Sequence, residues 1–486
     1  MTMAVRTNEI ASYVAGEWRR GPGSGTDTNP ARPSEVVASV SMADVKIAQD
    51  AVAAAKAALP AWSTMPAPAR GDILRAAGDL LDQRAEDIAR DLTREEGKTI
   101  GEALREARWS ANVLRYHAAQ TLDPDGETLP SSRANVHAYT KREALGVVTA
   151  ITPWNFPVLI PAWKIAPALA FGNTVVWKPA EIVPLSAVKL LQVLVDAGLP
   201  SGVLNLVLGK SSQVGDVITT HPSVNGVSFT GSTSVGRAIQ AKATAAGKKV
   251  QLEMGGKNPL LVLADADLDL AADATARGAF ISCGQKCTST GRVIVERGVL
   301  GAFVDRLAAR AEAMKLGDPL EKDTVLGPVS SSEQLTKILG FVERARAQGA
   351  RSVTGGVRGE GALAEGYFVR PSVLVDVRPD HEVARDEVFG PVAPIIAVDS
   401  YDEAIGVAND TRYGLTASVF TNDLKKAMRF TRESQAGVVL VNQETAGVEY
   451  YAPFGGIKDS GAGSRERGKA AREFNTELKT VYVNYP

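Results

Sequence analysis

The sequence predicts an α/β protein that consists of parallel sheets joined by crossover helices. Three observations support this prediction. Residues 147–252 alternate short β-rich runs with helical patterns, residues 259–314 repeat this alternation, and residues 480–485 form one further alternating strand. Strands that alternate with helices in this way are typical of parallel sheets. A length of 486 residues with 45% hydrophobic residues allows two or three packed domains.

The first part of the chain predicts helices, from about residue 44 to residue 122. The Ala-rich segment 44–59 has Val45, Ala48, Val52 and Ala55 at helical spacing, and we expect its helix to end before Pro60. Residues 123–135 are rich in Asp, Pro, Gly and Ser and predict a linker or turn. Strand-like segments follow at 135–140 and 143–150.

The two alternations predict two domains and an arm. The first predicts a Rossmann-like cofactor domain of residues 1–122 and 145–256, with strands at 147–151, 174–177, 204–207, 224–229 and 249–252 and helices at 161–171, 185–197, 212–220 and 235–245. The second predicts an α/β catalytic domain of residues 257–456, with strands at 259–263 and 292–296 and helices at 267–280 and 300–314. Residues 123–144 and 470–486 are left for a small β oligomerisation arm, whose terminal strand could pair with a sheet edge of another subunit.

Composition and charge argue against several classes of partner. The 54 basic and 55 acidic residues nearly cancel, so we expect no nucleic-acid partner. The longest apolar stretches are short and interrupted by Lys164, so we expect no membrane partner. Residues 1–9 lack the apolar core of a signal peptide and two cysteines cannot form a disulfide framework, which predicts a cytoplasmic protein. Four scattered histidines without an H-E-x-x-H pattern predict no metal site.

Cys287 and Glu253 are the first candidates for catalysis. Cys287 lies in a Gly/Ser/Thr-rich stretch, and Glu253 precedes Gly255 and Gly256 about thirty residues upstream. A thiol in a turn and a carboxylate on a glycine loop suggest covalent catalysis with a separate general base. The alternative is that Cys287 is a small buried hydrophobe. Cys283, four residues earlier, could face the same way on a helical turn or be a packed spectator.

A turn after the expected strand 224–229 is a candidate for binding a pyrophosphate. Gly231 and Ser232 lie where this strand gives way to a helix, so backbone N–H groups and the helix dipole would face an anion. The spacing is not G-x-G-x-x-G, and an ordinary turn with Ser232 as N-cap is the alternative. A dinucleotide template would assign Glu253 to the ribose, but Lys178 and Glu181, after another strand, could bind the ribose hydroxyls and leave Glu253 free for chemistry.

Seven ordered motifs resemble those of the aldehyde dehydrogenase superfamily, and the resemblance spans roughly residues 16–484. The motifs are Thr152-Pro153-Trp154-Asn155-Phe156-Pro157, Trp177-Lys178-Pro179-Ala180-Glu181, Phe229-Thr230-Gly231-Ser232, Glu253-Met254-Gly255-Gly256-Lys257, Gly284-Gln285-Lys286-Cys287, Glu387-Val388-Phe389-Gly390-Pro391 and Pro453-Phe454-Gly455-Gly456. Met254 stands where the family more often has Leu, a volume-conserving difference.

The resemblance implies a role for each motif. Cys287 would attack the aldehyde carbon, Asn155 and the Cys287 N–H would form an oxyanion hole, and Glu253 would activate the water that hydrolyses the thioester. NAD would accept the hydride, with NADP as a possible substitute, and the family's multimeric members imply a homodimer or homotetramer. The residues that the resemblance places at the cofactor are Thr152, Pro153, Trp154, Lys178, Glu181, Gly231, Ser232, Glu387 and Phe389.

Within the superfamily the sequence is most similar to 2-oxoglutarate semialdehyde (2,5-dioxopentanoate) dehydrogenases. This similarity rests on residues 151–167 and 445–451. Lys286 would then meet the distal carboxylate of the substrate, although it could equally be a solvated lysine. The expected apolar lining consists of Ile160, Trp163, Val448 and Tyr450.

Three alternatives to this substrate stay open. They are a succinate-semialdehyde dehydrogenase, an enzyme for a broad range of aliphatic or aromatic aldehydes, and a catalytically silent binding protein of the same fold. An acyl-phosphate or acyl-CoA reductase would tend to lack Glu253, because its thioester passes to an acceptor other than water.

Overall fold

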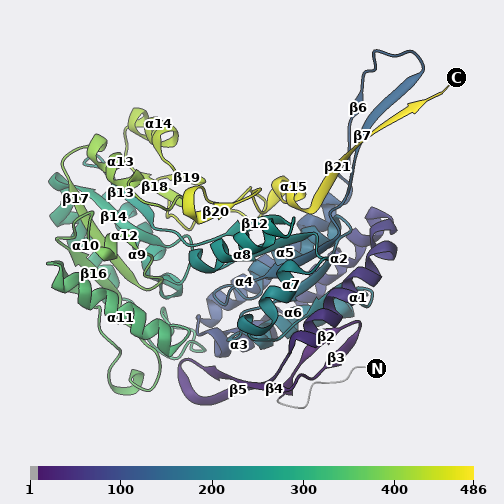
Figure 1. Ribbon diagram of the computed structural model, residues 1–486. Coiled ribbons are helices and arrows are strands. Elements are labelled where there is room, and N and C mark those ends of the chain that lie inside the picture. The colour runs from purple at the N-terminus through teal and green to yellow at the C-terminus, as the bar shows by residue number, and fades with distance from the viewer. Residues whose placement is uncertain (1–8, 486) are drawn as a thin grey trace.

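A computed structural model describes residues 9–485, whose strands form four sheets (Figure 1). The expectation about a signal peptide concerns residues 1–9, of which 1–8 lie outside the described residues, as does Pro486 at the end of the expected arm. Among the described residues, no helix combines the length and the apolar character that crossing a membrane requires.

The first large sheet confirms the predicted alternation of strands and helices. Its order is β20-β12-β11-β8-β9-β10-β2-β3. Five central strands are parallel: β12 (Lys249–Glu253), β11 (Gly226–Thr230), β8 (Val147–Ile151), β9 (Thr174–Lys178) and β10 (Leu204–Leu206). The antiparallel edge strands are β20 (Gly461–Ala462), β2 (Ser12–Val14) and β3 (Glu17–Arg19).

Helices cover both faces of this sheet, which is why its central strands are apolar without alternation. In β9, Val176 faces one core and its neighbours Val175 and Trp177 face the other. The helices of the first face are α1 (Val45–Thr64), α7 (Ser211–Thr220) and α8 (Thr233–Ala245). Those of the second are α2 (Ala67–Gln83), α3 (Ala85–Glu96), α4 (Ile100–Gln120), α5 (Leu159–Ala170) and α6 (Pro184–Asp196).

Helix α1 differs from the prediction at its C-terminal end. We expected it to end before Pro60, but it continues through Pro60 to Thr64. Proline removes one backbone donor and crowds the preceding turn. Trp62 is 1% exposed and packs in the core, so burial of its side chain outweighs this cost at the last turn.

The second large sheet has the order β15-β16-β17-β14-β13-β18-β19, and only β15 is antiparallel to its neighbour. The strands are β15 (Arg351–Thr354), β16 (Ser372–Val375), β17 (Val392–Val398), β14 (Thr290–Glu296), β13 (Asn258–Val262), β18 (Thr416–Phe420) and β19 (Val438–Val441). Its helices are α9 (Leu268–Phe280), α10 (Leu300–Glu312), α11 (Ser332–Ala347), α12 (Glu382–Arg385), α13 (Tyr401–Asn409) and α14 (Leu424–Glu433).

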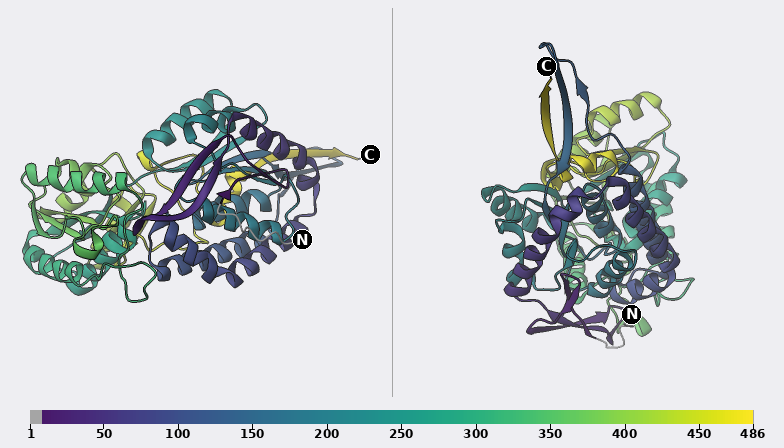
Figure 2. Two further views of the ribbon diagram at one scale, coloured as in Figure 1. Left: turned by 90° about the horizontal axis from the view of Figure 1, so that it is seen from below. Right: turned by 90° about the vertical axis from the view of Figure 1, so that its right-hand side faces the viewer.

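A three-stranded antiparallel sheet extends away from the two large sheets (Figures 1 and 2). It consists of β21 (Thr476–Asn484), β7 (Val136–Ala144) and β6 (Thr128–Leu129), and α15 (Ala471–Asn475) leads into it. A fourth sheet, β1 (Glu9–Ile10), β5 (Arg32–Met42) and β4 (Gly23–Asn29), lies in a region for which the sequence analysis named no element.

Candidate active site

Two cavities meet at Cys287 and lie where the C-terminal ends of the first sheet's strands approach the second sheet. The first cavity is lined by residues that follow β8, β11 and β12, and by residues from the second sheet's side. They are Pro153, Trp154, Asn155, Ile160, Thr230, Gly231, Ser232, Met254, Gly255, Cys287, Gln334, Lys337, Glu387 and Phe389. Ligands of α/β proteins bind at this edge of a parallel sheet. We call it the cofactor cavity.

The second cavity shares Cys287 and Ile160 with the first. Its other lining residues are Glu102, Arg105, Glu106, Trp109, Phe156, Leu159, Trp163, Ile281, Ser282, Lys286, Thr288, Ala446, Val448 and Arg467. We call it the aldehyde cavity, because Ile160, Trp163, Lys286 and Val448, which the sequence analysis expected at the substrate, line it. A single sulfur atom between two cavities can contact a substrate from one and a redox cofactor from the other.

The loop that carries Cys287 is held by several side-chain hydrogen bonds. Asn258 Nδ2 donates to the carbonyl oxygen of Cys287 at 2.8 Å, and Thr445 Oγ1 donates to that of Thr288 at 2.7 Å. Ser282 and Cys283 have positive φ angles of 57° and 50°. Residues 281–284 therefore form a tight turn through the left-handed region, not the α-helical turn that would have aligned the two cysteines.

Cys283 lies on the far side of this turn, in the apolar core. Its Sγ approaches the carbonyl oxygen of Gly327 at 3.1 Å, and its side chain packs with Leu326 and Val329. Cys283 lines neither cavity. The structure therefore places it as a packed residue, one of the two alternatives that the sequence left open.

Burial raises the pKa of the Cys287 thiol to about 12, and the Arg467 guanidinium is the strongest influence in the opposite direction. Glu253 and Glu387 are nearby acids that raise this pKa further. A neutral thiol is a weak nucleophile, so the reaction requires a group that removes its proton or a cation that stabilises the thiolate.

Glu253 ends β12 and is 4% exposed. Burial raises the pKa of its carboxyl well above the ordinary value, and Glu466 raises it further. Its Oε2 atom is buried without a hydrogen-bond partner. Lys164 Nζ pairs with Glu466 and also donates to Ser228 Oγ at 3.0 Å. A buried ion pair, Lys164 with Glu466, thus lies beside Glu253.

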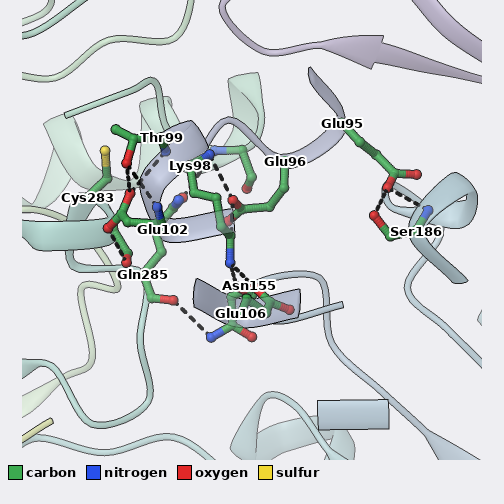
Figure 3. Close-up of polar contacts among 12 residues, drawn as sticks. Glu95, Glu96, Lys98, Thr99, Glu102, Glu106, Asn155, Ser186, Cys283 and Gln285 are labelled. Carbon is green, nitrogen blue, oxygen red and sulfur yellow. Dashed lines mark hydrogen bonds and ion pairs between the residues drawn. The ribbon is translucent and has the colours of Figure 1, made fainter. Parts of the chain in front are cut away.

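Asn155 connects the cofactor cavity to a buried charged cluster. Its Nδ2 donates to the carbonyl oxygen of Gln285 at 2.8 Å, which leaves one amide hydrogen for another acceptor. Its own carbonyl oxygen accepts from Lys98 Nζ at 2.7 Å. Figure 3 shows the hydrogen bonds from Lys98 to Asn155 and from Asn155 to Gln285.

The cluster behind Asn155 is fully bonded, and we call it the Lys98 network (Glu96, Lys98, Thr99, Glu102 and Glu106). Lys98 Nζ donates to Glu106 at 2.5 Å, and Glu106 also accepts from the backbone N–H groups of Val158 and Leu159. Thr99 and Glu102 form a capping box at the start of α4. The network therefore fixes both the first turn of α4 and the start of α5, next to Asn155 (Figure 3).

Glu387 and Phe389 line the cofactor cavity from the side of the second sheet. Glu387 Oε1 accepts from the backbone N–H of Gly256 at 2.9 Å, and a Cβ atom on Gly255 would overlap the same carboxylate. Phe389 meets Trp154 edge to face, with ring centroids 5.3 Å apart. Gly255 thus allows the close approach of Glu387, whereas a Cβ atom on Gly256 would meet Asn258 and the Cys287 carbonyl oxygen.

The turn from β11 to α8 differs in detail from the expected anion site. The N–H of Gly231 is not free, because it donates to the carbonyl oxygen of Glu253 at 3.1 Å. Ser232 occupies the N-cap position, but its side chain caps no backbone N–H. Thr230 Oγ1 is buried without a partner beside this turn. The first N–H groups of α8 and this hydroxyl are suited to a pyrophosphate.

Thr152, Lys178 and Glu181 do not line the cofactor cavity. Thr152 Oγ1 accepts from Trp177 Nε1 at 3.0 Å. Glu181 accepts from the N–H of Ser211 at 2.7 Å and lies 3.8 Å from Lys178 Nζ. Lys178 and Glu181 are adjacent at the end of β9, as a ribose site requires, but one Glu181 oxygen is already bonded.

Four of the five expected substrate residues line the aldehyde cavity, namely Ile160, Trp163, Lys286 and Val448. Tyr450 does not. It packs against Tyr116, with ring centroids 6.2 Å apart, at the margin of the large core. Lys286 Nζ donates to the carbonyl oxygen of Arg277 at 3.1 Å. Arg467 was missed, because no spacing in the sequence relates it to Trp163.

The described residues contain no group of three or more His, Cys, Asp or Glu side chains close enough to hold a metal ion.

Comparison with known proteins gives one family. The model of the aldehyde dehydrogenase family matches residues 18–481. An alpha-ketoglutaric semialdehyde dehydrogenase of Bacillus subtilis is 43% identical and is covered over its full length by 99% of this chain. An alpha-ketoglutarate semialdehyde dehydrogenase of Haloferax volcanii is 45% identical, again over 99% of this chain and all of the relative.

A third relative and a solved structure agree with this result. A 2,5-dioxopentanoate dehydrogenase of Saccharolobus solfataricus is 42% identical over 97% of this chain and 99% of the relative. The crystal structure of a betaine aldehyde dehydrogenase from Staphylococcus aureus, in complex with NAD+, is 36% identical and superimposes with a TM-score of 0.95. The matched regions cover 98% of this chain and 94% of that one.

Proposed function

Because the chain belongs to the aldehyde dehydrogenase family, we propose that its substrate is 2-oxoglutarate semialdehyde, which it oxidises to 2-oxoglutarate. The class of enzyme itself is an NAD(P)-dependent aldehyde dehydrogenase. The single observation that carries the substrate proposal is that three relatives, at 42–45% identity and matched over nearly their full length, are named for this semialdehyde or its synonym 2,5-dioxopentanoate. The cationic side chains in the aldehyde cavity support it.

The arrangement around Cys287 supports the following sequence of steps. The sulfur attacks the aldehyde carbon and forms a thiohemiacetal, while the free Asn155 amide hydrogen and the Cys287 N–H bind the oxygen. NAD, when bound, accepts the hydride that leaves this carbon. Loss of the hydride and of the hydroxyl proton leaves a thioester on Cys287. Glu253 then removes a proton from water, whose oxygen displaces the sulfur and releases the acid.

An aldehyde panel tests the substrate. The rate of cofactor reduction is measured with 2-oxoglutarate semialdehyde, succinate semialdehyde, hexanal and benzaldehyde, and kcat/KM is compared. We expect 2-oxoglutarate semialdehyde to have the highest value. A higher value for hexanal or benzaldehyde would favour an enzyme of broad specificity, and the absence of turnover with every aldehyde would favour the silent binding protein.

Lys178 and Glu181 are the proposed ribose-binding pair, with NAD preferred over NADP. The carboxylate of Glu181 would accept hydrogen bonds from the ribose hydroxyls and repel a 2′-phosphate. Its position beside Lys178 supports this role. Steady-state kinetics with both cofactors test it, because a strong preference for NADP contradicts the role of Glu181.

We further propose a homodimer or homotetramer in the cytoplasm, assembled through the arm of residues 123–144 and 470–486. The domain boundaries at 122, 144 and 256 remain predictions. Strand β21 exposes Leu478 (57%), Tyr482 (61%) and Val483 (44%) on a sheet that extends away from the rest of the chain. Exposed apolar side chains on an edge strand are suited to pairing with another subunit. A monomer in light scattering at micromolar concentration would contradict this assembly.

A further inference from the structure

Arg467 combines burial, aromatic contacts and a lack of hydrogen-bond acceptors. Arg467 is 4% exposed to solvent. The centre of its guanidinium lies 3.7 Å from the Trp163 ring centroid and 4.1 Å from that of Phe454. Two aromatic rings therefore hold this cation, and its stacked contacts leave the N–H groups at its edge for other partners.

The guanidinium forms no hydrogen bond or ion pair with any other part of residues 9–485, and its Nε is buried without a partner. Guanidinium groups in protein interiors are normally paired, because a buried unpaired charge is costly. Trp163 Nε1 is a second buried donor without a partner. Two unsatisfied donors thus belong to adjacent side chains that line the same cavity.

The backbone at Arg467 is strained, with φ 59° and ψ 168°. This region is occupied almost exclusively by glycine, and other residues adopt it mainly where surrounding structure enforces it. Here, the backbone of Glu466 is paired with Phe454 in both directions, which fixes the chain immediately before Arg467. The strained conformation indicates a functional role for Arg467, because residues with such backbone angles concentrate at binding and active sites.

The other charged residues of the aldehyde cavity are less available to a ligand. Glu102 and Glu106 are bonded within the Lys98 network. Lys286 donates to the carbonyl oxygen of Arg277, and the charges of Glu444 and Glu102 favour its protonated form. Arg105 also lines the cavity but is exposed at its mouth. Arg467 is therefore the cation best placed to meet an anionic ligand inside the cavity.

We propose that Arg467 is a specificity-determining residue that binds the carboxylate of an oxo-acid semialdehyde. A guanidinium forms two parallel hydrogen bonds with a carboxylate, and a 2-oxo acid offers a further oxygen acceptor next to it. This inference rests on the proposed function, in which such a semialdehyde is the substrate. It assigns to Arg467 the role that the sequence analysis gave to Lys286.

The test compares charged and uncharged aldehydes in matched variants. Arg467→Met retains much of the side chain's length and apolar contact, Arg467→Lys retains the charge, and Arg472→Met is the control, because Arg472 lines neither cavity. Each variant and the wild type are assayed with 2-oxoglutarate semialdehyde, succinate semialdehyde and pentanal.

We expect Arg467→Met to lower kcat/KM for the two acids about ten- to hundredfold more than for pentanal, as loss of charge-assisted hydrogen bonds predicts. Arg467→Lys should recover part of this loss, and Arg472→Met should resemble the wild type.

Equal losses for acids and pentanal would overturn the inference and show that Arg467 serves Cys287. Arg467 is the main influence that lowers the Cys287 pKa, so such a role would also shift the pH dependence of iodoacetamide alkylation of Cys287 upward in Arg467→Met. A second measurement does not require turnover. Added 2-oxoglutarate should slow alkylation of Cys287 in the wild type and not in Arg467→Met, and equal protection in both would also overturn it.

Failure of the proposed function gives a different result. If wild-type enzyme prefers succinate semialdehyde over 2-oxoglutarate semialdehyde, the substrate is wrong while Arg467→Met still discriminates acids from pentanal. If wild-type enzyme prefers 2-oxoglutarate semialdehyde and Arg467→Met affects all three aldehydes alike, the substrate is right and the assignment of Arg467 is wrong.

Discussion

Two buried polar regions meet at Asn155, and they differ in how completely their polar atoms are bonded. In the Lys98 network the lysine and its acids all have partners within a few residues of α4 and α5. Around Cys287, by contrast, Glu253 Oε2, Thr230 Oγ1, Trp163 Nε1 and Arg467 Nε are buried without partners. Each such atom costs about 1–3 kcal/mol in an otherwise packed interior.

This difference indicates that the Lys98 network positions the site and that the groups around Cys287 take part in binding and reaction. A fully bonded buried network holds one geometry, and here it fixes the carbonyl of Asn155. The atoms without partners around Cys287 are donors and acceptors that the protein itself does not satisfy, whereas the Lys98 network is complete in the protein alone. Changes in the first region should affect turnover, and changes in the second should affect stability.

The largest expected effect comes from the two cysteines, which lie on the two sides of one turn. Cys287→Ser should lower kcat by about 10³-fold or more, as for other covalent nucleophiles, because an alkoxide is far harder to form than a thiolate. Cys283→Ser, in the packed core, should retain most activity. Steady-state kinetics of both variants check this, and similar values for the two would show that Cys287 is not the nucleophile.

Replacement of Glu253 should separate the chemical steps. Glu253→Gln should release about one reduced cofactor per active site and then lose about 10²- to 10⁴-fold in steady-state rate, the usual contribution of a general base. Intact-protein mass spectrometry should then show the acyl group on Cys287. Glu106→Gln, in the bonded network, is the matched control and should accumulate no acyl-enzyme. If Glu253→Gln shows neither burst nor adduct, Glu253 acts before hydride transfer.

Removal of Lys98 tests the bonded region. Lys98→Met leaves the Glu106 carboxylate and the Asn155 carbonyl without their cation, so the free energy of unfolding should fall by about 3–5 kcal/mol. The exposed pair of Lys46 and Asp50 offers a control, and Lys46→Met should cost at most about 1 kcal/mol. Urea unfolding measures both. Equal costs for the two variants would mean that the network does not stabilise the fold.

Much of the fold could be predicted because buried parallel strands produce continuous apolar runs, as in β8 and β9. Strand β4 was missed for the opposite reason, since its sequence Gly-Ser-Gly-Thr-Asp-Thr-Asn is polar even at the buried positions Asp27 and Asn29. The path of α1 through Pro60 depends on the burial of Trp62, a tertiary contact that helical spacing does not reveal.

Some residues of the site could likewise be predicted from local sequence, and others depend on tertiary contacts. Cys287, Glu253 and Glu387 stand in glycine-containing motifs, where the local sequence itself demands close approach, and such motifs are visible without a structure. The guanidinium of Arg467 contacts Trp163 and Phe454, which are distant from each other in the chain. The outward packing of Tyr450 against Tyr116 likewise depends on α4, which precedes it by hundreds of residues.

The smallest predicted effect concerns pH and the buried Glu253 carboxyl. Burial raises its pKa in the folded protein, so the folded state keeps a proton that the unfolded chain releases near its ordinary pKa of about 4.3. Unfolding above that pH releases the proton, so the contribution of Glu253 to the free energy of unfolding falls as pH rises toward the folded-state pKa. This contribution falls by up to about 1.4 kcal/mol per pH unit.

The variant Glu253→Gln has no carboxyl proton to release. Urea unfolding at fixed protein concentration between about pH 5 and pH 7 should therefore show the variant gaining stability relative to the wild type. If the free energy of unfolding of the two proteins varied with pH in parallel, Glu253 would be ionised in the folded state. The cavity around Cys287 would then stabilise the Glu253 carboxylate, as the Lys98 network stabilises its own acids.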